Sequence, residues 1–249
     1  MSIRYNFLLM SGLLLTTAVQ SETLNVAVAS NFVYTLKLLS NDFMQRTDHS
    51  LLISSASTGK LYAQIQHGAP FDVFLAADEK RPDLLIKENK ADDASAYVYA
   101  IGRLVLMSNI VSSDNCQSVL TSSSLHHLSI ANPKIAPYGV AAKQVLEKLS
   151  LWSQLQPKLV RGENVAQALQ FISTGNAQAG FVAGSMLVMD NKVDSACIWV
   201  IPADVYSPIK QKMVLLKKAK DKPAAQAFIQ YMQSERAKEI IKSSGYDVM

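Results

Sequence analysis

The feature that most constrains this chain is a repeated order of short apolar segment, small polar turn and amphipathic segment. Thr23–Ala29 is an apolar, β-branched run, which predicts a buried strand. Ser30-Asn31 follows, residue types that suit a helix N-cap. The next segment has apolar residues at helical spacing, namely Phe32, Leu36, Leu39 and Phe43. Strand, polar turn and helix in repetition are typical of a parallel α/β sheet.

The same order continues through both halves of the chain. Further strands are predicted at residues 51–53, 72–77, 104–106, 127–131 and 180–182. Further helices are predicted around residues 61–65, 138–149, 164–173, 223–232 and 234–244. No linker rich in Pro, Gly or Ser separates the halves, and the 249 residues suit one large domain or two modest lobes.

The N-terminus has the pattern of a secretory signal peptide. Arg4 provides a positive start, residues 7–19 are mostly apolar, and small residues stand at the two positions that a signal peptidase reads. The run is too short and too polar at its flanks for a membrane span. We expect cleavage after Ser21, a mature chain that begins at Glu22, and a soluble exported protein.

The charge of the chain makes nucleic acid an unfavourable partner. Lys and Arg number 24 and Asp and Glu 20, and removal of Arg4 with the signal leaves 23 − 20, or +3. The basic residues form no dense block. This small positive excess would attract anions only weakly once salt screens it.

The two cysteines, Cys116 and Cys197, can be interpreted in two ways. In an oxidising compartment they can form a disulfide, which would add about 4 kcal/mol of stability for a loop of this size. They can also be two separate buried thiols. Neither lies in a metal-ligand or redox motif.

The junctions between predicted strands and helices carry small hydroxyl residues instead of charges. In open parallel sheets ligands bind at the carboxyl ends of strands, near helix N-termini. Helix N-termini have unpaired N–H groups and a partial positive charge, so several of them aimed at one point can bind an anion without Lys or Arg. Since no carboxylate lies in the junctions at Ser30, Ser57-Thr58 or Tyr138, a fully deprotonated dianion fits better than a protonated phosphate, which needs an acceptor.

Several segments, taken in order, resemble the periplasmic molybdate-binding proteins of ABC importers. The similarity runs over nearly the whole mature chain. Its segments are ASNF at 29–32, SASTGKLYAQI at 55–65, GAPFDVF at 68–74, AADEK at 76–80, ANP at 131–133, APYG at 136–139, GENV at 162–165 and GFVA at 180–183. Each is short, and their order and spacing carry the resemblance.

The resemblance implies a two-lobed α/β periplasmic binding protein. Each lobe would have a central, mostly parallel sheet flanked by helices, with the ligand in the cleft between lobes. Residues 1–21 would be the signal peptide, 22–102 plus 214–249 lobe one, and 103–213 lobe two. The protein would bind molybdate or tungstate in the periplasm and deliver it to an inner-membrane ABC permease. It would be a monomer with no cofactor and no enzymatic activity.

The resemblance also places the ligand contacts. They fall at Ser30, Asn31, Ser57, Thr58, Tyr138 and Val165. The oxygens of molybdate would be contacted by Ser30 and Thr58 through hydroxyl and backbone groups, and by Tyr138 and Val165 through backbone N–H groups at helix starts. Two departures affect the pocket size and hence selectivity: Ala183 stands where one branch of the family has tyrosine, and Thr58 where serine is usual.

Two alternatives remain beside this function. The same fold could bind sulfate or another small oxyanion, which charge alone does not separate from molybdate. An exported serine hydrolase is the second, because Ser57-Thr58-Gly59-Lys60 fits S-x-x-K and Ser113-Asp114-Asn115 fits S-D-N. The third element of that enzyme class, K-T-G, is absent downstream.

Overall fold

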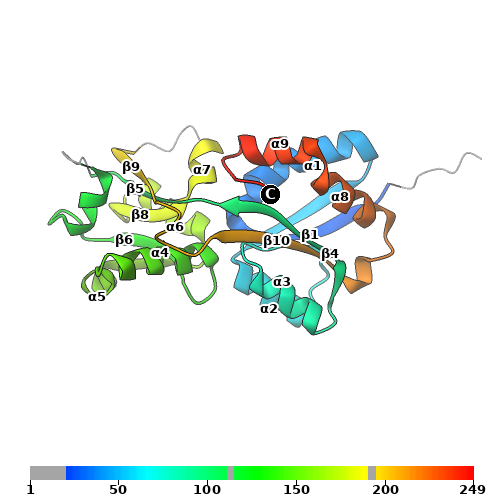
Figure 1. Ribbon diagram of the computed structural model, residues 1–249, viewed down its shortest axis with the longest axis horizontal. Coiled ribbons are helices and arrows are strands. Elements are labelled where there is room, and N and C mark those ends of the chain that lie inside the picture. The colour runs from blue at the N-terminus through cyan, green and yellow to red at the C-terminus, as the bar shows by residue number, and fades with distance from the viewer. Residues whose placement is uncertain (1–20, 111–114, 190–194) are drawn as a thin grey trace, which may run out of the picture.

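The computed structural model describes residues 21–110, 115–189 and 195–249. The chain forms two five-stranded sheets, each with its own helices, which lie side by side along the long axis of the molecule (Figure 1). Residues 1–20, which include nearly all of the predicted signal peptide, lie outside the described part. No helix in the described part is long and apolar enough to span a membrane.

The first sheet has the strand order β2-β1-β3-β10-β4. Its strands are β1 (Thr23–Ala29), β2 (Ser50–Ala56), β3 (Val73–Leu75), β4 (Ala91–Gly102) and β10 (Ile209–Leu216). β1 pairs in parallel with β2 and β3, whereas β10 is antiparallel to both β3 and β4. Four of these strands therefore point the same way and β10 points the opposite way.

Helices cover both faces of the first sheet. α1 (Val33–Thr47), α8 (Pro223–Gln233) and α9 (Glu235–Ser243) lie on one face, and α2 (Thr58–Gln66) and α3 (Lys80–Lys87) on the other (Figure 1). The apolar face predicted for the first helix is fully buried at Phe32, Leu36, Leu39 and Phe43. Burial of such side chains contributes about 1.5–3 kcal/mol each.

The second sheet repeats this pattern with the order β7-β6-β8-β5-β9. Its strands are β5 (Leu104–Ser108), β6 (Leu128–Ala131), β7 (Leu159–Gly162), β8 (Ala179–Ala183) and β9 (Cys197–Val200). β6 is parallel to β7 and β8, and β5 is antiparallel to β8 and β9. Again one strand of the described five, here β5, opposes the others.

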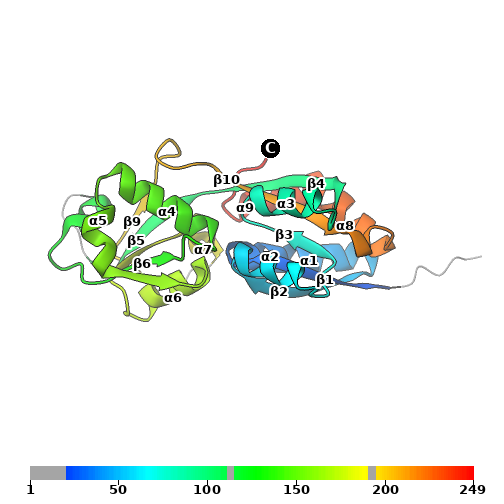
Figure 2. The same ribbon diagram turned by 90° about the horizontal axis from the view of Figure 1, so that it is seen from below.

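Four helices of the described residues accompany the second sheet. They are α4 (Pro137–Lys148), α5 (Trp152–Leu155), α6 (Val165–Ser173) and α7 (Gly184–Met189). α4 and α6 cover opposite faces (Figure 2). Four one- or two-turn 3-10 helices complete the described elements: Ser30–Phe32, Cys116–Thr121, Gln156–Lys158 and Lys217–Ala219. Cys116 and Cys197 form a disulfide, with Cα atoms 5.5 Å apart, that fastens the 3-10 helix Cys116–Thr121 to β9.

The chain passes between the two sheets twice. It leaves the first sheet after β4 and returns from β9 to β10. The C-terminal segment lies beside the first of these crossings, where Asp247 forms an isolated bridge with Ile101 of β4. The predicted lobe boundary at 102/103 falls between β4 and β5, and the one at 213/214 falls inside β10; the division into lobes stays a prediction.

The predicted fold class is confirmed, with local differences. The prediction of Ser30 or Asn31 as helix N-cap is wrong: Ser30–Phe32 form a 3-10 turn, and Phe32 precedes α1 without a side-chain cap. Strands β7 and β9 and helices α3, α5 and α7 were not predicted. The strands β4 and β10 were not predicted either. Both carry polar residues among apolar ones, and their pairing with each other depends on segments far apart in sequence.

Candidate functional site

The carboxyl ends of strands from both sheets meet around one small cavity. Its lining comprises Ala29, Ser30, Asn31, Ser57, Thr58, Ala77, Ala136, Pro137, Tyr138, Asn164 and Val165. All six predicted ligand-binding residues are among them, and the lining contributes no charged side chain. The cavity is small, because the centre of a water molecule can move through only about 10 Å³ of it. Only a ligand of a few atoms therefore fits unless the two sides move apart.

The first sheet contributes hydroxyl groups at the ends of β1 and β2. Thr58 is the first residue of α2, and its Oγ1 accepts a hydrogen bond from the Ala77 N–H at 3.0 Å. The hydroxyl proton of Thr58 is therefore directed elsewhere and can be donated to a ligand. Ser57 caps α2 by accepting from the Lys60 N–H at 3.4 Å. Ser30 begins the 3-10 turn after β1 and is buried.

The second sheet contributes backbone N–H groups at two helix starts. Tyr138 is the second residue of α4, after Pro137, and Val165 is the first residue of α6. A residue in the first turn has no intrahelical acceptor for its N–H. Asn164 caps α6 by accepting from the Gln167 N–H at 3.0 Å, which leaves the Val165 N–H directed out of the helix.

A glycine permits the close approach of α4 to the end of β6. A Cβ atom at Gly139 would lie 2.2 Å from the Ala131 carbonyl oxygen, a separation that side chains do not tolerate. The sequence Pro137-Tyr138-Gly139 thus starts the helix directly over the strand end and places the Tyr138 N–H beside the cavity.

The electrostatic character of the cavity comes from dipoles. α2, α4 and α6 begin at its wall, and helix N-termini carry partial positive charge. Burial raises the pKa of Tyr138 well above its ordinary value of 10.0, and neighbouring tyrosines raise it further. Tyr138 is therefore neutral, and the cavity favours an anion without holding a formal positive charge.

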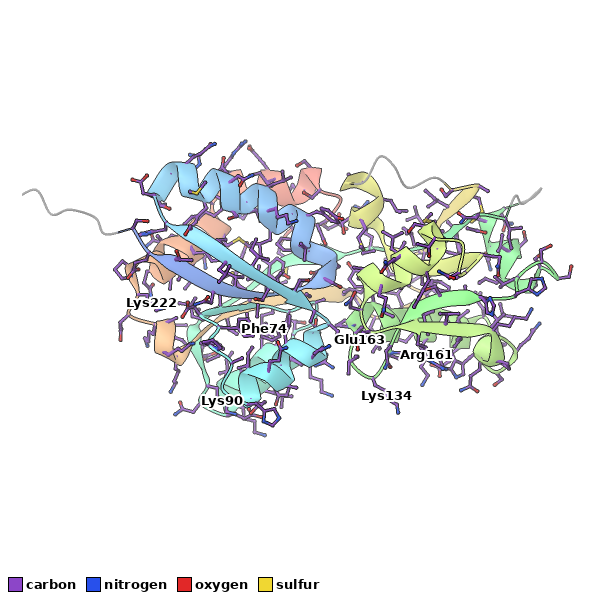
Figure 3. The ribbon with its side chains drawn as sticks, turned by 180° about the vertical axis from the view of Figure 1, so that it is seen from behind. Phe74, Lys90, Lys134, Arg161, Glu163 and Lys222 are labelled. Carbon is purple, nitrogen blue, oxygen red and sulfur yellow. A yellow bond between two sulfur atoms is a disulfide. The ribbon has the colours of Figure 1, made fainter. Side chains whose placement is uncertain are left out.

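The two sides of the cavity contact each other at its rim. The Gly59 N–H donates to the Ile135 carbonyl oxygen at 2.8 Å. Lys60 Nζ lies 3.0 Å from Glu163 Oε2, and Figure 3 shows Glu163 at the junction of the two sheets. A Cβ at Gly59 would lie 2.9 Å from the Ile135 oxygen, so this main-chain contact requires glycine. The two sides of the cavity are therefore in direct contact at this rim.

Asn31 has a different role from the one its position suggests. Its side-chain amide donates to Gln211 Oε1 at 2.9 Å and to Tyr246 Oη at 3.1 Å. What Asn31 offers to the cavity is therefore its backbone N–H. The sequence reasoning did not find Gln211 or Tyr246. Gln211 stands between two lysines in the polar first half of β10, so no local signal marked it.

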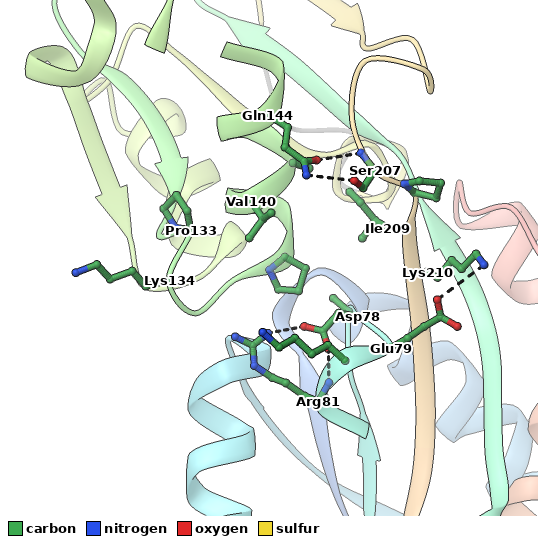
Figure 4. Close-up of a pocket in the computed structure, with 15 residues that line it drawn as sticks. Asp78, Glu79, Arg81, Pro133, Lys134, Val140, Gln144, Ser207, Ile209 and Lys210 are labelled. Atoms are coloured by element: carbon green, nitrogen blue, oxygen red, sulfur yellow. Dashed lines mark hydrogen bonds and ion pairs between the residues drawn. The ribbon is translucent and has the colours of Figure 1, made fainter. Parts of the chain in front are cut away.

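A larger hollow lies outside this cavity, between α3 and α4, and has a volume of about 360 Å³ (Figure 4). Among its charged side chains, Asp78 pairs with Arg81, and Glu79 with Lys210 at 3.8 Å. Gln144 exchanges hydrogen bonds with Ser207 across it. Because this outer groove includes the carboxylates of Asp78 and Glu79, which repel an anion, it is a poorer site for a fully deprotonated anion than the small cavity.

The described residues contain no group of three or more His, Cys, Asp and Glu side chains able to hold a metal ion. Asp72, which could appear available, is buried and bound to Lys222 Nζ at 2.9 Å.

Comparison with known proteins gives consistent results. The family model for bacterial extracellular solute-binding proteins matches residues 24–247. The molybdate-binding protein ModA of Azotobacter vinelandii is 47% identical over 234 residues, covering 94% of this chain and 93% of the relative. The ModA protein of Rhodobacter capsulatus is 40% identical over 220 residues, covering 88% and 86%.

A solved structure has the same fold throughout. The periplasmic molybdate-binding protein of Azotobacter vinelandii superposes with a TM-score of 0.85 at 40% identity, covering 91% of this chain and 99% of that structure.

Proposed function

Because the chain belongs to the family of bacterial extracellular solute-binding proteins, we propose that it binds molybdate and delivers it to a membrane permease of the ABC type. The observation that carries this proposal is the small uncharged cavity between the two sheets, lined by hydroxyl and main-chain donors. The names of the two most similar relatives reported above supply the ligand. Tungstate, a dianion of the same shape, is the expected second ligand.

The site residues have distinct roles in this proposal. Ser30 and Thr58 donate hydroxyl and backbone hydrogen bonds, while Tyr138 and Val165 donate backbone N–H groups from the opposite side. Asn31 and Ser57 complete the wall. Each oxygen of a dianion must be met by donors because its desolvation is costly. Hydrogen bonds to a charged group compensate by about 1.5–3 kcal/mol each.

The arrangement of protons supports a fully deprotonated ligand. Thr58 Oγ1 already accepts from the Ala77 N–H, so its hydroxyl faces a ligand as a donor. The lining contains no carboxylate that could accept a ligand O–H. Protonated phosphate should therefore bind far more weakly than molybdate. Sulfate has the right charge and remains the alternative, with cavity size deciding between the two.

Binding and delivery would follow from closure between two lobes, residues 22–102 plus 214–249 and residues 103–213. In the open state each lobe exposes its donors to water. The dianion adds contacts that exist only when both lobes meet, so it shifts the population to the closed state. The closed form would dock on the permease. The protein would act in the periplasm as a monomer, after removal of residues 1–21, without a cofactor.

The serine hydrolase alternative receives little support from the S-x-x-K residues. Ser57 Oγ accepts from the backbone N–H of Lys60, and the Lys60 ammonium lies at the surface against Glu163. A lysine acting as base must contact the serine oxygen itself. Ser113 and Asp114 of the S-D-N sequence lie outside the described residues.

Calorimetric titration with molybdate, tungstate, sulfate and phosphate in parallel tests the proposal. We expect tight binding of molybdate and tungstate, weaker binding of sulfate and none of phosphate. Equal affinity for all four, or binding of none, would contradict it. Hydrolysis of a chromogenic β-lactam by the purified protein would instead support the enzyme.

A further inference from the structure

A buried chain of hydrogen-bonded side chains connects the cavity to the strands that pass between the sheets. It joins side chains from six separate segments: Asn31, Tyr99, Tyr138, Ser185, Gln211 and Tyr246. All six are buried. Asn31 and Tyr138 line the cavity, whereas Gln211 lies on β10, directly after the chain returns from the second sheet.

The direction of each hydrogen bond in this network follows from the Asn31 carbonyl oxygen at one end of it. The backbone carbonyl oxygen of Asn31 can only accept, and it takes the Tyr246 hydroxyl proton at 2.8 Å. With its proton used, Tyr246 Oη must accept from its other neighbours. These are Ser185 Oγ at 2.9 Å and Asn31 Nδ2 at 3.1 Å. The Asn31 amide is thereby oriented with its nitrogen inward.

That orientation determines the orientation of Gln211. The same Asn31 nitrogen donates to Gln211 Oε1 at 2.9 Å, and the Tyr99 hydroxyl lies 3.1 Å from this oxygen on its other side. The Tyr99 hydroxyl also donates to the Ala76 carbonyl oxygen, at 3.0 Å. The Asn31 amide is therefore the donor that fixes the orientation of Gln211. Its nitrogen Nε2 must point the other way, where it donates to Tyr138 Oη at 3.4 Å.

The consequence concerns the Tyr138 hydroxyl. Because Tyr138 Oη accepts from Gln211, its own proton must go to a different acceptor, and the hydrogen bonds of the described residues include none for it. Burial raises the pKa of Tyr138, so the proton stays on the oxygen. Tyr138 lines the cavity, and an oxyanion there would supply the missing acceptor.

We propose that Gln211 is a positioning residue that holds the Tyr138 hydroxyl as a hydrogen-bond donor to the bound oxyanion. It does not touch the ligand and acts through Tyr138. Close packing maintains this geometry: a Cβ at Gly102 would lie 2.1 Å from Tyr138 Oη and 2.8 Å from Gln211 Nε2. This inference rests on the proposed function, since it requires an oxyanion in the cavity.

A double-mutant cycle with molybdate as the titrant tests the proposal. Gln211→Met keeps the length of the side chain but removes its donor, and we expect about 10-fold weaker binding. Tyr138→Phe should weaken binding by about 10-fold or more, because it removes a hydrogen bond to a charged ligand. In the Tyr138→Phe background, Gln211→Met should cost less than about twofold further, because the group through which it acts is gone.

Tyr231→Phe is the matched control. The Tyr231 hydroxyl donates to Asp42 Oδ2 at 3.0 Å, outside this network and outside the cavity lining, so the affinity of this variant for molybdate should stay within about twofold of that of the unmodified protein. Thermal unfolding of each variant verifies that it folds. If Gln211→Met weakens binding equally with and without the Tyr138 hydroxyl, its role is structural and the proposal fails.

Gln211→Glu gives a second readout when it is compared with and without the Tyr138 hydroxyl, because a carboxylate here also repels the dianion directly and only the withdrawal of the hydroxyl proton depends on Tyr138. A carboxylate at this position accepts the Tyr138 proton and withdraws it from the ligand. We expect binding of molybdate to be lost at pH 8.5 and to recover at pH 6, because burial raises the pKa of a carboxyl group. A pH-independent affinity for this variant, or an equal loss with and without the Tyr138 hydroxyl, would overturn the proposal. Failure of the unmodified protein to bind any dianion would instead refute the proposed function.

Discussion

The two sides of the cavity provide hydrogen-bond donors by different means. The first sheet presents side-chain hydroxyls at Ser30 and Thr58, which follow β1 and β2 directly. The second sheet presents main-chain N–H groups at the starts of α4 and α6, where Pro137 and Asn164 set the helix ends. One side therefore depends on residue identity, and the other depends mainly on where a helix begins.

The same two halves also differ in how they are held together. Aromatic side chains pack in the core of the first half, as in the edge-to-face contact of Phe32 with Tyr99 at 4.7 Å. The second half holds the disulfide Cys116–Cys197 at its outer edge. We therefore expect substitutions in the two halves to change different measured quantities: the free energy of unfolding for the disulfide, and the ligand affinity for the hydroxyl groups.

Removal of the disulfide should have the largest effect. Substitution of both Cys116 and Cys197 by serine should lower the free energy of unfolding by about 4 kcal/mol, since the closed loop is long. Denaturant unfolding measures the loss, and hydrogen exchange locates it. Protection should fall in β5, β9 and their neighbours while β1 keeps its protection. An equal fall in both sheets would contradict the proposed difference between the halves.

Removal of a hydroxyl group from the first sheet should have the second largest effect. Ser30→Ala and Thr58→Ala should each weaken molybdate binding by about 1.5–3 kcal/mol, as expected for hydrogen bonds to a charged group. Calorimetric titration gives the values. Ser54→Ala, on β2 but outside the lining, is the control. Unchanged affinity in both variants would show that the ligand lies elsewhere.

At Val165 the contributions of the side chain and of the backbone N–H to ligand affinity can be measured separately. Val165→Ala keeps the N–H and should change affinity by less than about 0.5 kcal/mol. Val165→Pro removes the N–H at the first helical position, where proline is tolerated, and should weaken binding by about 1.5–3 kcal/mol. The extended backbone of Asn164, at φ −150° and ψ 174°, can precede a proline. Equal affinities for the two variants would refute a main-chain donor here.

The ion pair across the rim should matter less. Lys60 and Glu163 have side chains 50% and 63% exposed, so solvent screens their attraction. Lys60→Ala should weaken binding by about 0.2–1 kcal/mol at low salt, and less as salt increases. Titration at two ionic strengths checks this. A large effect that does not depend on salt would mean that Lys60 contacts the ligand.

The smallest expected effect is that of pH. The pKa of Tyr138 is raised by burial, so its neutral form is favoured and the proton is retained to higher pH than in free tyrosine. Its hydroxyl remains a donor throughout the range from pH 7 to 9. Affinity for molybdate should be constant in that range, as measured by titration at several pH values. A decrease in affinity toward pH 9 would indicate that a titrating group contacts the anion.

Local patterns predicted much of the fold and the arrangement of the cavity residues. Thr23–Ala29 has the bounds of β1, and the helix at 164–173 differs from α6 by only its capping residue, because burial and helix periodicity are local signals. The resemblance placed six residues that the structure gathers around one cavity. Their role in binding remains a prediction.

What sequence reasoning missed depends on contacts between distant segments. β10 was overlooked because its polar first half, Ile209-Lys210-Gln211-Lys212, gives a weak strand signal until it pairs with β3 and β4. The connection of Asn31 to Gln211 and Tyr246 has no local signature, since it joins residues about two hundred positions apart.

The place of β10 in the first sheet has a consequence for how the protein is made. β10 lies between β3 and β4, yet it is synthesised only after the entire second sheet. Until it arrives, β3 and β4 each present an unpaired edge, the kind of surface that promotes association between nascent chains. The second half, formed by one continuous stretch from β5 to β9, can fold as soon as it emerges. We therefore expect the half that is made first to be the last to be completed.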